Sequence, residues 1–402
     1  MLQAHTRVRL LDILCRAVRS TCVPFRPGRI DSGSADVSPS QVQCNALKMA
    51  TYLLFSTISS AESAFVAVKA ADGSRKMKGR ETIDDGGEDS FNWLEHRELA
   101  VVALAEVLEV DMSKLWTMGI PDENFISLFC RISYQLLEQP IAGRSGSVKT
   151  MLLKLIAVPM HLVKNIETQV VATVMHLLNN YEHTVTAVAD LCRMMATEMH
   201  DARLATSVLR DAVRIDFKST AVRNGLGIKH VAAFITELSV ALPSLVMQHM
   251  SIILPLLDSE FYGLRSAIVV AVGNAIAGAT LADVVAADPE GDGGKTHSAV
   301  SFTRTRDTLL DVLIERAHDV NSFTRAAVVK VWSTLCEKQV LPLARVHGIV
   351  MVAIDRLQDK SVVVRKASMQ VSTESKLSTR PQHHQTRDPC LSIPFLAMHI
   401  SS

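Results

Sequence analysis

The stretch HDVNSFTR, from His318 to Arg325, decides the fold of this chain. Its acid and small polar residues are typical of a turn that caps a helix, and its arginine stands where that helix begins. An apolar series follows at helical spacing, at Val328, Val331 and Leu335. The stretch therefore predicts a turn followed by a helix that buries one face.

The same order of acid, turn and arginine occurs in two other segments, Asp258 to Arg265 and Asp359 to Arg365. The last two of the three arginines are 40 residues apart, and the first two are 60 apart. A Gly- and Asp-rich insert near 286–295 lengthens the first interval. Without about twenty residues there, the period is ~40 throughout, which is typical of paired-helix HEAT repeats. We therefore expect an α-solenoid that acts through its surfaces rather than through a pocket.

The composition supports an all-α fold. Apolar residues make up 48% of the 402 residues and aromatic residues only 5%, which suits helix-on-helix packing, and strand signals are nearly absent. The net charge of +1 excludes a global basic field for nucleic acid. The seven cysteines are scattered without a C-x-x-C pair, so we expect free thiols rather than disulfides or a zinc site.

The chain divides into five expected segments. These are an N-terminal helical region over 1–70, a charged disordered loop over 71–90, a helical domain over 91–200, a repeat segment over 201–370 with an insert at 282–300, and a disordered or aberrant tail over 371–402. The helical pattern stops near Val371, which favours a fragment, a splice product or a mis-predicted gene end. Residues 1–29 hold six arginines against one acid, and we favour an amphipathic opening helix there over a mitochondrial transit peptide.

No catalytic motif is present, so we expect no enzyme, no cofactor, no metal and no small-molecule substrate. The segment from Gly291 to Thr296 resembles the end of a phosphate-binding loop, but Pro289 stands where that loop needs glycine. Of the two longest uncharged runs, 238–257 is interrupted by Pro243, and 266–282 is shorter than the ~20 residues that a bilayer requires. We therefore expect no membrane span.

Local basic residues are the candidates for contacts with the DNA backbone. Over 301–370 the basic residues outnumber the acids by 11 to 7, and the candidates there are Arg325, Lys330, Lys360, Arg365 and Lys366. A second basic face, spaced to share one side of a helix, consists of Arg203, Arg210 and Arg214. The alternative interpretation is structural, because an acid at a turn can pair with an arginine of an adjacent repeat. The residues that we expect to form such pairs are Asp319, Arg325, Asp359 and Arg365.

Several segments resemble one known family. The first is DMSKLWTMGIPDENFISL at 111–128, and the second half adds AFITEL at 233–238, LDSEFYGLRSAI at 257–268, HDVNSFTR at 318–325 and RLQDKSVVVRK at 356–366. Over roughly 41–370 the chain resembles condensin complex subunit 1, the regulatory HEAT subunit of condensin I. The resemblance identifies 91–200 as a helical domain of the N-terminal type found in that family.

The resemblance implies a non-catalytic subunit that acts in mitotic chromosome condensation, in the nucleus and on chromosomes, and in the cytoplasm for part of the cell cycle. Its implied partners are the kleisin and SMC subunits of condensin, together with double-stranded DNA or chromatin, bound weakly or only within the complex. Members of the family are much longer than this chain, and none of their site residues can be transferred to it. The alternative is a HEAT scaffold of another class, a nuclear-transport receptor or a coat adaptor, that binds peptide segments.

Overall fold

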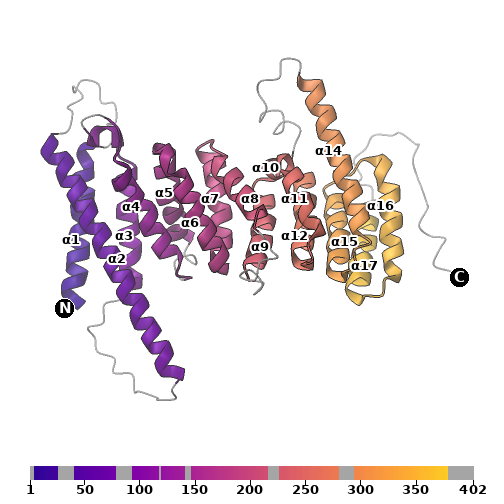
Figure 1. Cartoon of the computed structure of the whole chain (residues 1–402), viewed down its shortest axis with the longest axis horizontal. Coiled ribbons are helices and arrows are strands. Elements are labelled where there is room, and N and C mark those ends of the chain that lie inside the picture. The colour runs from indigo at the N-terminus through magenta and orange to yellow at the C-terminus, as the bar shows by residue number, and fades with distance from the viewer. Residues whose placement is uncertain are drawn as a thin grey trace.

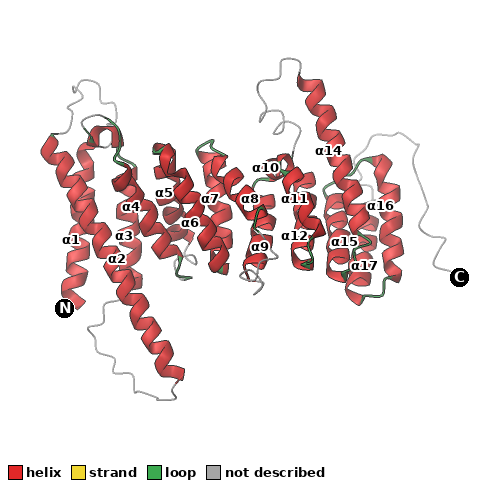
Figure 2. Ribbon diagram, viewed as in Figure 1, coloured by secondary structure: helices red, strands yellow, loops and turns green. Residues whose placement is uncertain are grey.

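The fold is all-α in the part of the chain that the structure describes. This computed structural model describes residues 4–25, 40–77, 93–116, 119–140, 146–215, 226–279 and 294–378. Every regular element in these ranges is helical, and no strand occurs in them (Figure 2). The expected fold class is therefore confirmed.

Helices of moderate length follow one another along the chain. The first half contains α1 (Ala4–Cys22), α2 (Gln41–Met77), α3 (Trp93–Leu108), α4 (Glu123–Leu137), α5 (Gly146–Leu162), α6 (Glu167–Asn180), α7 (Val185–Glu198) and α8 (Arg203–Val213). The second half contains α9 (Leu226–Ala241), α10 (Pro243–Gln248), α11 (Met250–Ile253), α12 (Tyr262–Gly278), α14 (Gly294–Arg316), α15 (Ser322–Glu337), α16 (Leu343–Asp355) and α17 (Val362–Ser378). Short 3₁₀ turns join several of them.

The helices stack into an elongated array, with α1 and α17 at opposite ends (Figure 1). One continuous row packs in the order α1, α3, α5, α7, α9, α12, α15 and α17, and the closest packing lies between α9, α12, α15 and α17. A second row, which includes α2, α4, α6 and α8, covers the first. Buried apolar side chains form one core along the array, from Leu11 in α1 to Ala367 in α17. This arrangement is that of a HEAT-type solenoid, in which each helix pair buries its apolar face on the next pair.

Local sequence signals explain where several helices begin. The side chain of Asp122 accepts a hydrogen bond from the Asn124 amide before α4, and Asn321 accepts one from the Phe323 amide before α15. Pro243 occupies the first turn of α10, where its missing N–H costs nothing. These caps and breaks separate one helical run from the next.

One glycine permits the close packing of α12 on α15. A Cβ atom added at Gly273 would lie 2.4 Å from Cγ1 of Val331, far inside van der Waals contact. Gly273 therefore lets the two helices approach more closely than any larger residue would allow, and it shapes the surface between them.

Three expected segment boundaries differ from the structure. Helix α2 continues to Met77, so the first residues of the segment expected to be a charged loop are helical. Helix α14 begins at Gly294, inside the expected insert, and α17 continues to Ser378, inside the expected tail. Helical propensity persists in these polar stretches because they extend helices that are already packed at their other end. The rest of the expected loop, insert and tail, at 78–90, 282–293 and 379–402, lies outside the described residues.

Helix α2 is the one described helix that is long and apolar enough to cross a membrane, judged by length and composition alone. The apolar stretch is Gln41–Val68, and 28% of its most apolar 18-residue window is buried in the array. Two polar contacts attach this helix to its neighbours. The buried Glu62 accepts a hydrogen bond from the indole of Trp93, and the amine of Lys48 lies 4.7 Å from the centre of the Trp116 ring.

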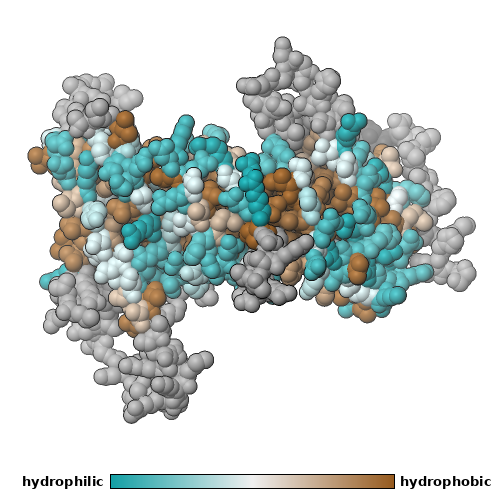
Figure 3. Space-filling model, in the orientation of Figure 1, coloured by the Kyte–Doolittle hydropathy of each residue, from teal (hydrophilic) through white to brown (hydrophobic). Residues whose placement is uncertain are grey.

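Hydrophilic residues cover much of the face of the array shown in Figure 3.

Candidate functional site

Arginines at the start of two C-terminal repeat helices, α12 and α15, link each of these repeats to the next one. In α12, Nε and Nη2 of Arg265 donate to the two carboxylate oxygens of Asp319, each over 2.9 Å. Its Nη1 donates to the carbonyls of Ser259 and Glu260 over 2.7 and 3.2 Å. The guanidinium thus closes its own turn and holds the turn of the following repeat.

The same arrangement recurs one repeat later. Arg325 in α15 donates twice to Asp359, over 2.8 Å each, and its Nη1 bonds the carbonyls of Asp319 and Val320. Arg365 in α17 makes only the bonds to its own turn. Its Nη1 donates to the carbonyls of Asp359 and Lys360 over 2.7 and 3.0 Å. We call this series, Arg265–Asp319 and Arg325–Asp359 with Arg365 at its end, the Arg–Asp ladder.

Each ladder acid also closes the turn in which it lies. An oxygen of Asp319 accepts from the Asn321 amide over 2.8 Å, and an oxygen of Asp359 accepts from the Ser361 amide over 2.9 Å. Both carboxylates are nearly inaccessible, with side chains 3% exposed, while their arginines are 12% and 14% exposed. The ladder is therefore partly buried, charge-assisted and bidentate, which is the strongest form of arginine–carboxylate pairing.

The electrostatics follow from this geometry. For Asp319, burial alone would raise the pKa, but hydrogen bonds from Arg265 and from the Asn321 amide outweigh it and lower the pKa below its ordinary value. For Asp359, the hydrogen bond from Arg325 is the main cause of a lowered pKa. The same hydrogen bonds raise the pKa of both arginines, so all four groups are charged at neutral pH.

The ladder decides which of the five candidate DNA contacts have free donors. Arg325 commits its guanidinium to Asp359 and two carbonyls, so it is a structural residue. The side chains of Lys330, Lys360 and Lys366 are exposed. Arg365 is half-buried, with one nitrogen engaged. Contact with DNA stays a prediction, and the three lysines are the residues whose geometry leaves them available for it.

The sequence pattern identified the acid of the first segment incorrectly. Asp258 is 82% exposed and lies 3.8 Å from Arg316, outside the ladder. Ser259 holds the position equivalent to Asp319 and Asp359, as its carbonyl accepts from Arg265. The expected ladder residues also omitted Arg265, although its place before an apolar run was the same signal that identified Arg325.

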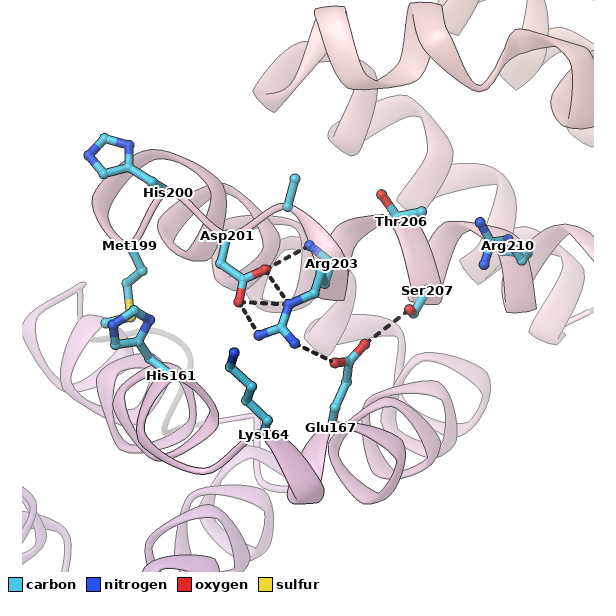
Figure 4. A pocket seen from close by; sticks show the side chains of 11 residues that line it. His161, Lys164, Glu167, Met199, His200, Asp201, Arg203, Thr206, Ser207 and Arg210 are labelled. Carbon is cyan, nitrogen blue, oxygen red and sulfur yellow. Dashed lines mark hydrogen bonds and ion pairs between the residues drawn. The ribbon is translucent and has the colours of Figure 1, made fainter. Parts of the chain in front are cut away.

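The second basic face lies at an open cavity of about 740 Å³ where the loops at the ends of α5 and α7 meet the start of α8 (Figure 4). Arg203 lies between two acids there. Its guanidinium bonds Asp201 over 2.6 to 3.2 Å and Glu167 over 3.1 Å. Arg210 lines the same cavity, whereas Arg214 caps the end of α8 and does not.

Charge at this cavity is largely balanced within it. The hydrogen bond from Arg203 lowers the pKa of Asp201, and that pairing also raises the pKa of the arginine. Lys164 and Arg210 are exposed and form no ion pair within the described part of the chain. The cavity is therefore a mixed-charge surface in which one arginine is neutralised and two cations remain. The described ranges contain no cluster of three or more His, Cys, Asp or Glu suited to a metal ion.

Comparison with known proteins gives one consistent family. Residues 4–188 match the family model of the non-SMC mitotic condensation complex subunit 1, N-terminal region. The chain is 28% identical to the condensin-1 complex subunit CAP-D2 of Arabidopsis thaliana over 81% of its length, and 28% identical to condensin complex subunit 1 of Homo sapiens over 92%. It is 27% identical to condensin complex subunit 1 of Xenopus laevis over 86%.

These matches cover 22%, 25% and 24% of the three relatives, so the chain spans about a quarter of their length. Since they cover 81% to 92% of the chain, they include most of the stacked helices described above, and they agree with the repeat period and with the all-α array. The chain is thus a homologue of condensin complex subunit 1 that carries that family's N-terminal region.

Proposed function

We propose that the chain is a non-catalytic scaffold subunit of a condensin complex, which binds the kleisin subunit and contributes to DNA engagement in mitotic chromosome condensation. The observation that carries this proposal is the similarity to proteins named condensin complex subunit 1 along 81% to 92% of the chain. The expected partners are kleisin, the SMC subunits, and DNA held weakly or only within the complex. The expected location is on chromosomes and in the nucleus, and in the cytoplasm for part of the cell cycle.

The geometry supports a scaffold because the Arg–Asp ladder fixes one repeat on the next. Each rung joins residues 34 or 54 positions apart through two charge-assisted hydrogen bonds. A stack held in this way presents its helix faces in a constant order, which favours binding of extended partners along many small contacts.

Engagement of DNA would depend on exposed lysines rather than on the ladder arginines. Lys330, Lys360 and Lys366 all extend from the C-terminal repeats and are exposed. Lysines of this kind neutralise phosphates without reading the base sequence, and each phosphate contact steepens the salt dependence of binding by about 0.9 in the logarithmic slope.

The test is binding of the full chain to kleisin and to double-stranded DNA, titrated against salt, with and without the other partner. We expect kleisin binding, and DNA binding that is stronger in the presence of kleisin. Replacing Lys330, Lys360 and Lys366 by Gln should make the salt slope shallower by up to about 0.9 per lysine. The control is Lys154→Gln, an exposed lysine of α5. Absence of kleisin binding would refute the scaffold proposal, and an unchanged salt slope would refute the DNA contacts.

A further inference from the structure

An apolar groove crosses three consecutive helices of the closely packed row. It has a volume of about 290 Å³ and lies between α12, α15 and α17. Its lining includes Val270 of α12, Phe323, Ala327 and Lys330 of α15, and Val363 of α17. Most of the lining is apolar, and none of these residues takes part in the Arg–Asp ladder.

The groove has exposed apolar walls. Phe323 lines the groove and is 54% exposed, and its ring stacks on that of Tyr262, outside the lining, with the ring centres 5.6 Å apart and the planes at 25°. Val363 on the next helix is 41% exposed. The small residues Gly273, Ala326 and Ala327 line the groove between them and leave it hollow. Contiguous exposed apolar side chains of this kind mark binding surfaces.

The lining of the groove contains one charged residue, Lys330, and no acid. Helix α12 contains no acid, α15 contains only Glu337 at its last position, and residues 362–370 of α17 contain none. Lys330 lines the groove, and Lys366 is exposed on α17. Neither lysine has an acidic partner within the described part of the chain.

The corresponding surface between α7 and α9 is different. The cavity there is lined by Asp190 and Glu237 together with Arg193. The row therefore changes from a mixed, acid-containing lining at α7 and α9 to a groove at α12, α15 and α17 whose lining contains Lys330 and no acid. A ligand that carries acids would be attracted to the second surface and not to the first.

We infer that the groove binds an extended peptide segment in which an apolar side chain is flanked by acidic residues. The apolar side chain would occupy the hollow beside Val270 and Ala327, and the acids would lie near Lys330, which leaves Lys360 and Lys366 for DNA when both ligands are bound. This inference rests on the proposed scaffold function, of which it names the site and the ligand chemistry. An apolar floor suits a side chain, whereas contacts to a DNA backbone are made mainly by hydrogen bonds to phosphate and sugar.

The test uses overlapping peptides that cover the kleisin of the same organism, each titrated with the full chain by fluorescence anisotropy. The tightest peptide is then titrated with Val363→Glu, Phe323→Ala and Lys330→Glu. Val363 lies in the first turn of α17, where an added carboxylate is tolerated, so that variant should fold. The matched control is Val362→Glu, which changes a neighbouring residue that is 53% exposed and does not line the groove.

We expect the tightest peptide to contain an apolar residue flanked by acids, and to lose about tenfold in affinity with each of the three groove variants. The Val362→Glu control should change its affinity less than about twofold. Replacing the acids of the peptide by Lys should restore binding to Lys330→Glu and weaken binding to the unmodified chain, as expected for a direct charge pair.

Three outcomes would overturn the inference. Kleisin peptides that bind equally well to Val363→Glu, Phe323→Ala and the unmodified chain would place the kleisin site elsewhere, and the scaffold proposal would stand. A short DNA duplex that loses affinity with Val363→Glu as strongly as with Lys330→Glu would assign the surface to DNA. If no kleisin binds, a designed peptide of alternating Leu and Asp tests the groove by itself, and its failure to bind would overturn the groove as a peptide site.

Discussion

Removing the carboxylate of Asp359 should detach the last described repeat from the one before it. Asp359→Ala deletes both hydrogen bonds from Arg325 and the bond from the Ser361 amide. It also leaves a partly buried guanidinium, 14% exposed, without its counter-ion. The two carbonyls that Arg325 already bonds remain in place.

The expected magnitude follows from these contacts. Loss of one partner from a fully buried ion pair costs about 3–5 kcal/mol. Since Arg325 keeps two acceptors and some solvent contact, we expect a loss of about 2–3 kcal/mol for Asp359→Ala. Asp359→Asn can keep the bonds that Oδ1 accepts from Nη2 of Arg325 and from the Ser361 amide, but it loses the charge and puts an amide donor where Oδ2 accepts from Nε of Arg325, so we expect a loss of about 1–2 kcal/mol.

The stabilisation by the Asp359 carboxylate should also depend on pH, in a direction that its pKa fixes. Arg325 lowers the pKa of Asp359 in the folded chain, whereas an unfolded aspartate titrates near ~3.9. A carboxylate with a lowered pKa stabilises the fold above the unfolded pKa, and this contribution is lost as the pH falls through the folded value. The difference between the unmodified chain and Asp359→Asn should therefore be constant from neutral pH down to about 5 and shrink below about 4.

The assay is native-state hydrogen exchange of peptides from α17, measured by mass spectrometry. Repeat arrays can open at one end without global unfolding, so a local measurement is needed. The control is Asp355→Ala, an exposed acid at the end of α16 whose side chain caps no helix. A change below about 0.5 kcal/mol, or an equal change in the control, would refute the ladder as the link between these repeats.

Gly273→Ala should destabilise the chain by about 1–3 kcal/mol in urea denaturation, because its Cβ would meet a stiff valine of α15 at 2.4 Å; no loss would contradict the close approach. Burial raises the pKa of the Cys130 and Cys192 thiols to about 12, so iodoacetamide at neutral pH should modify both only after unfolding, as judged by mass spectrometry of their peptides. Arg345 and Asp311 form an ion pair with side chains 36% and 57% exposed. Because the pair is exposed, Arg345→Gln should lower the free energy of unfolding in urea by less than about 0.5 kcal/mol, which is less than the loss expected for Asp359→Ala.

Much of the architecture was predictable because its signals are local. The apolar spacing after Arg325, the caps before α4 and α15, and the break at Pro243 each depend on residues within one or two turns. Such patterns fix helix type and approximate position, and the repeat period of ~40 predicts stacking. Helix ends were less predictable, as α2 and α17 show, because packing at one end lets a polar stretch continue the helix at the other.

The candidate surfaces depended on contacts that the sequence does not state. The pairing of Arg265 with Asp319 joins residues 54 positions apart, and the register of α12 against α15 decides it. In the same way, the register of α15 against α17 pairs Arg325 with Asp359 and removes Arg325 from the list of free cations. The volumes of the side chains at each interface between repeats set how the helices stack, and each interface is formed by residues of two repeats.

By itself, the sequence determined an all-α repeat array, its approximate helices and its family, because helical periodicity and family motifs are properties of contiguous residues. Only the tertiary structure decided which charged groups neutralise one another and which remain available. It also brought Val270, Phe323 and Val363 from three helices to one groove. The physical reason is that a binding surface of a solenoid forms between repeats, and its composition depends on how each helix is rotated against the next.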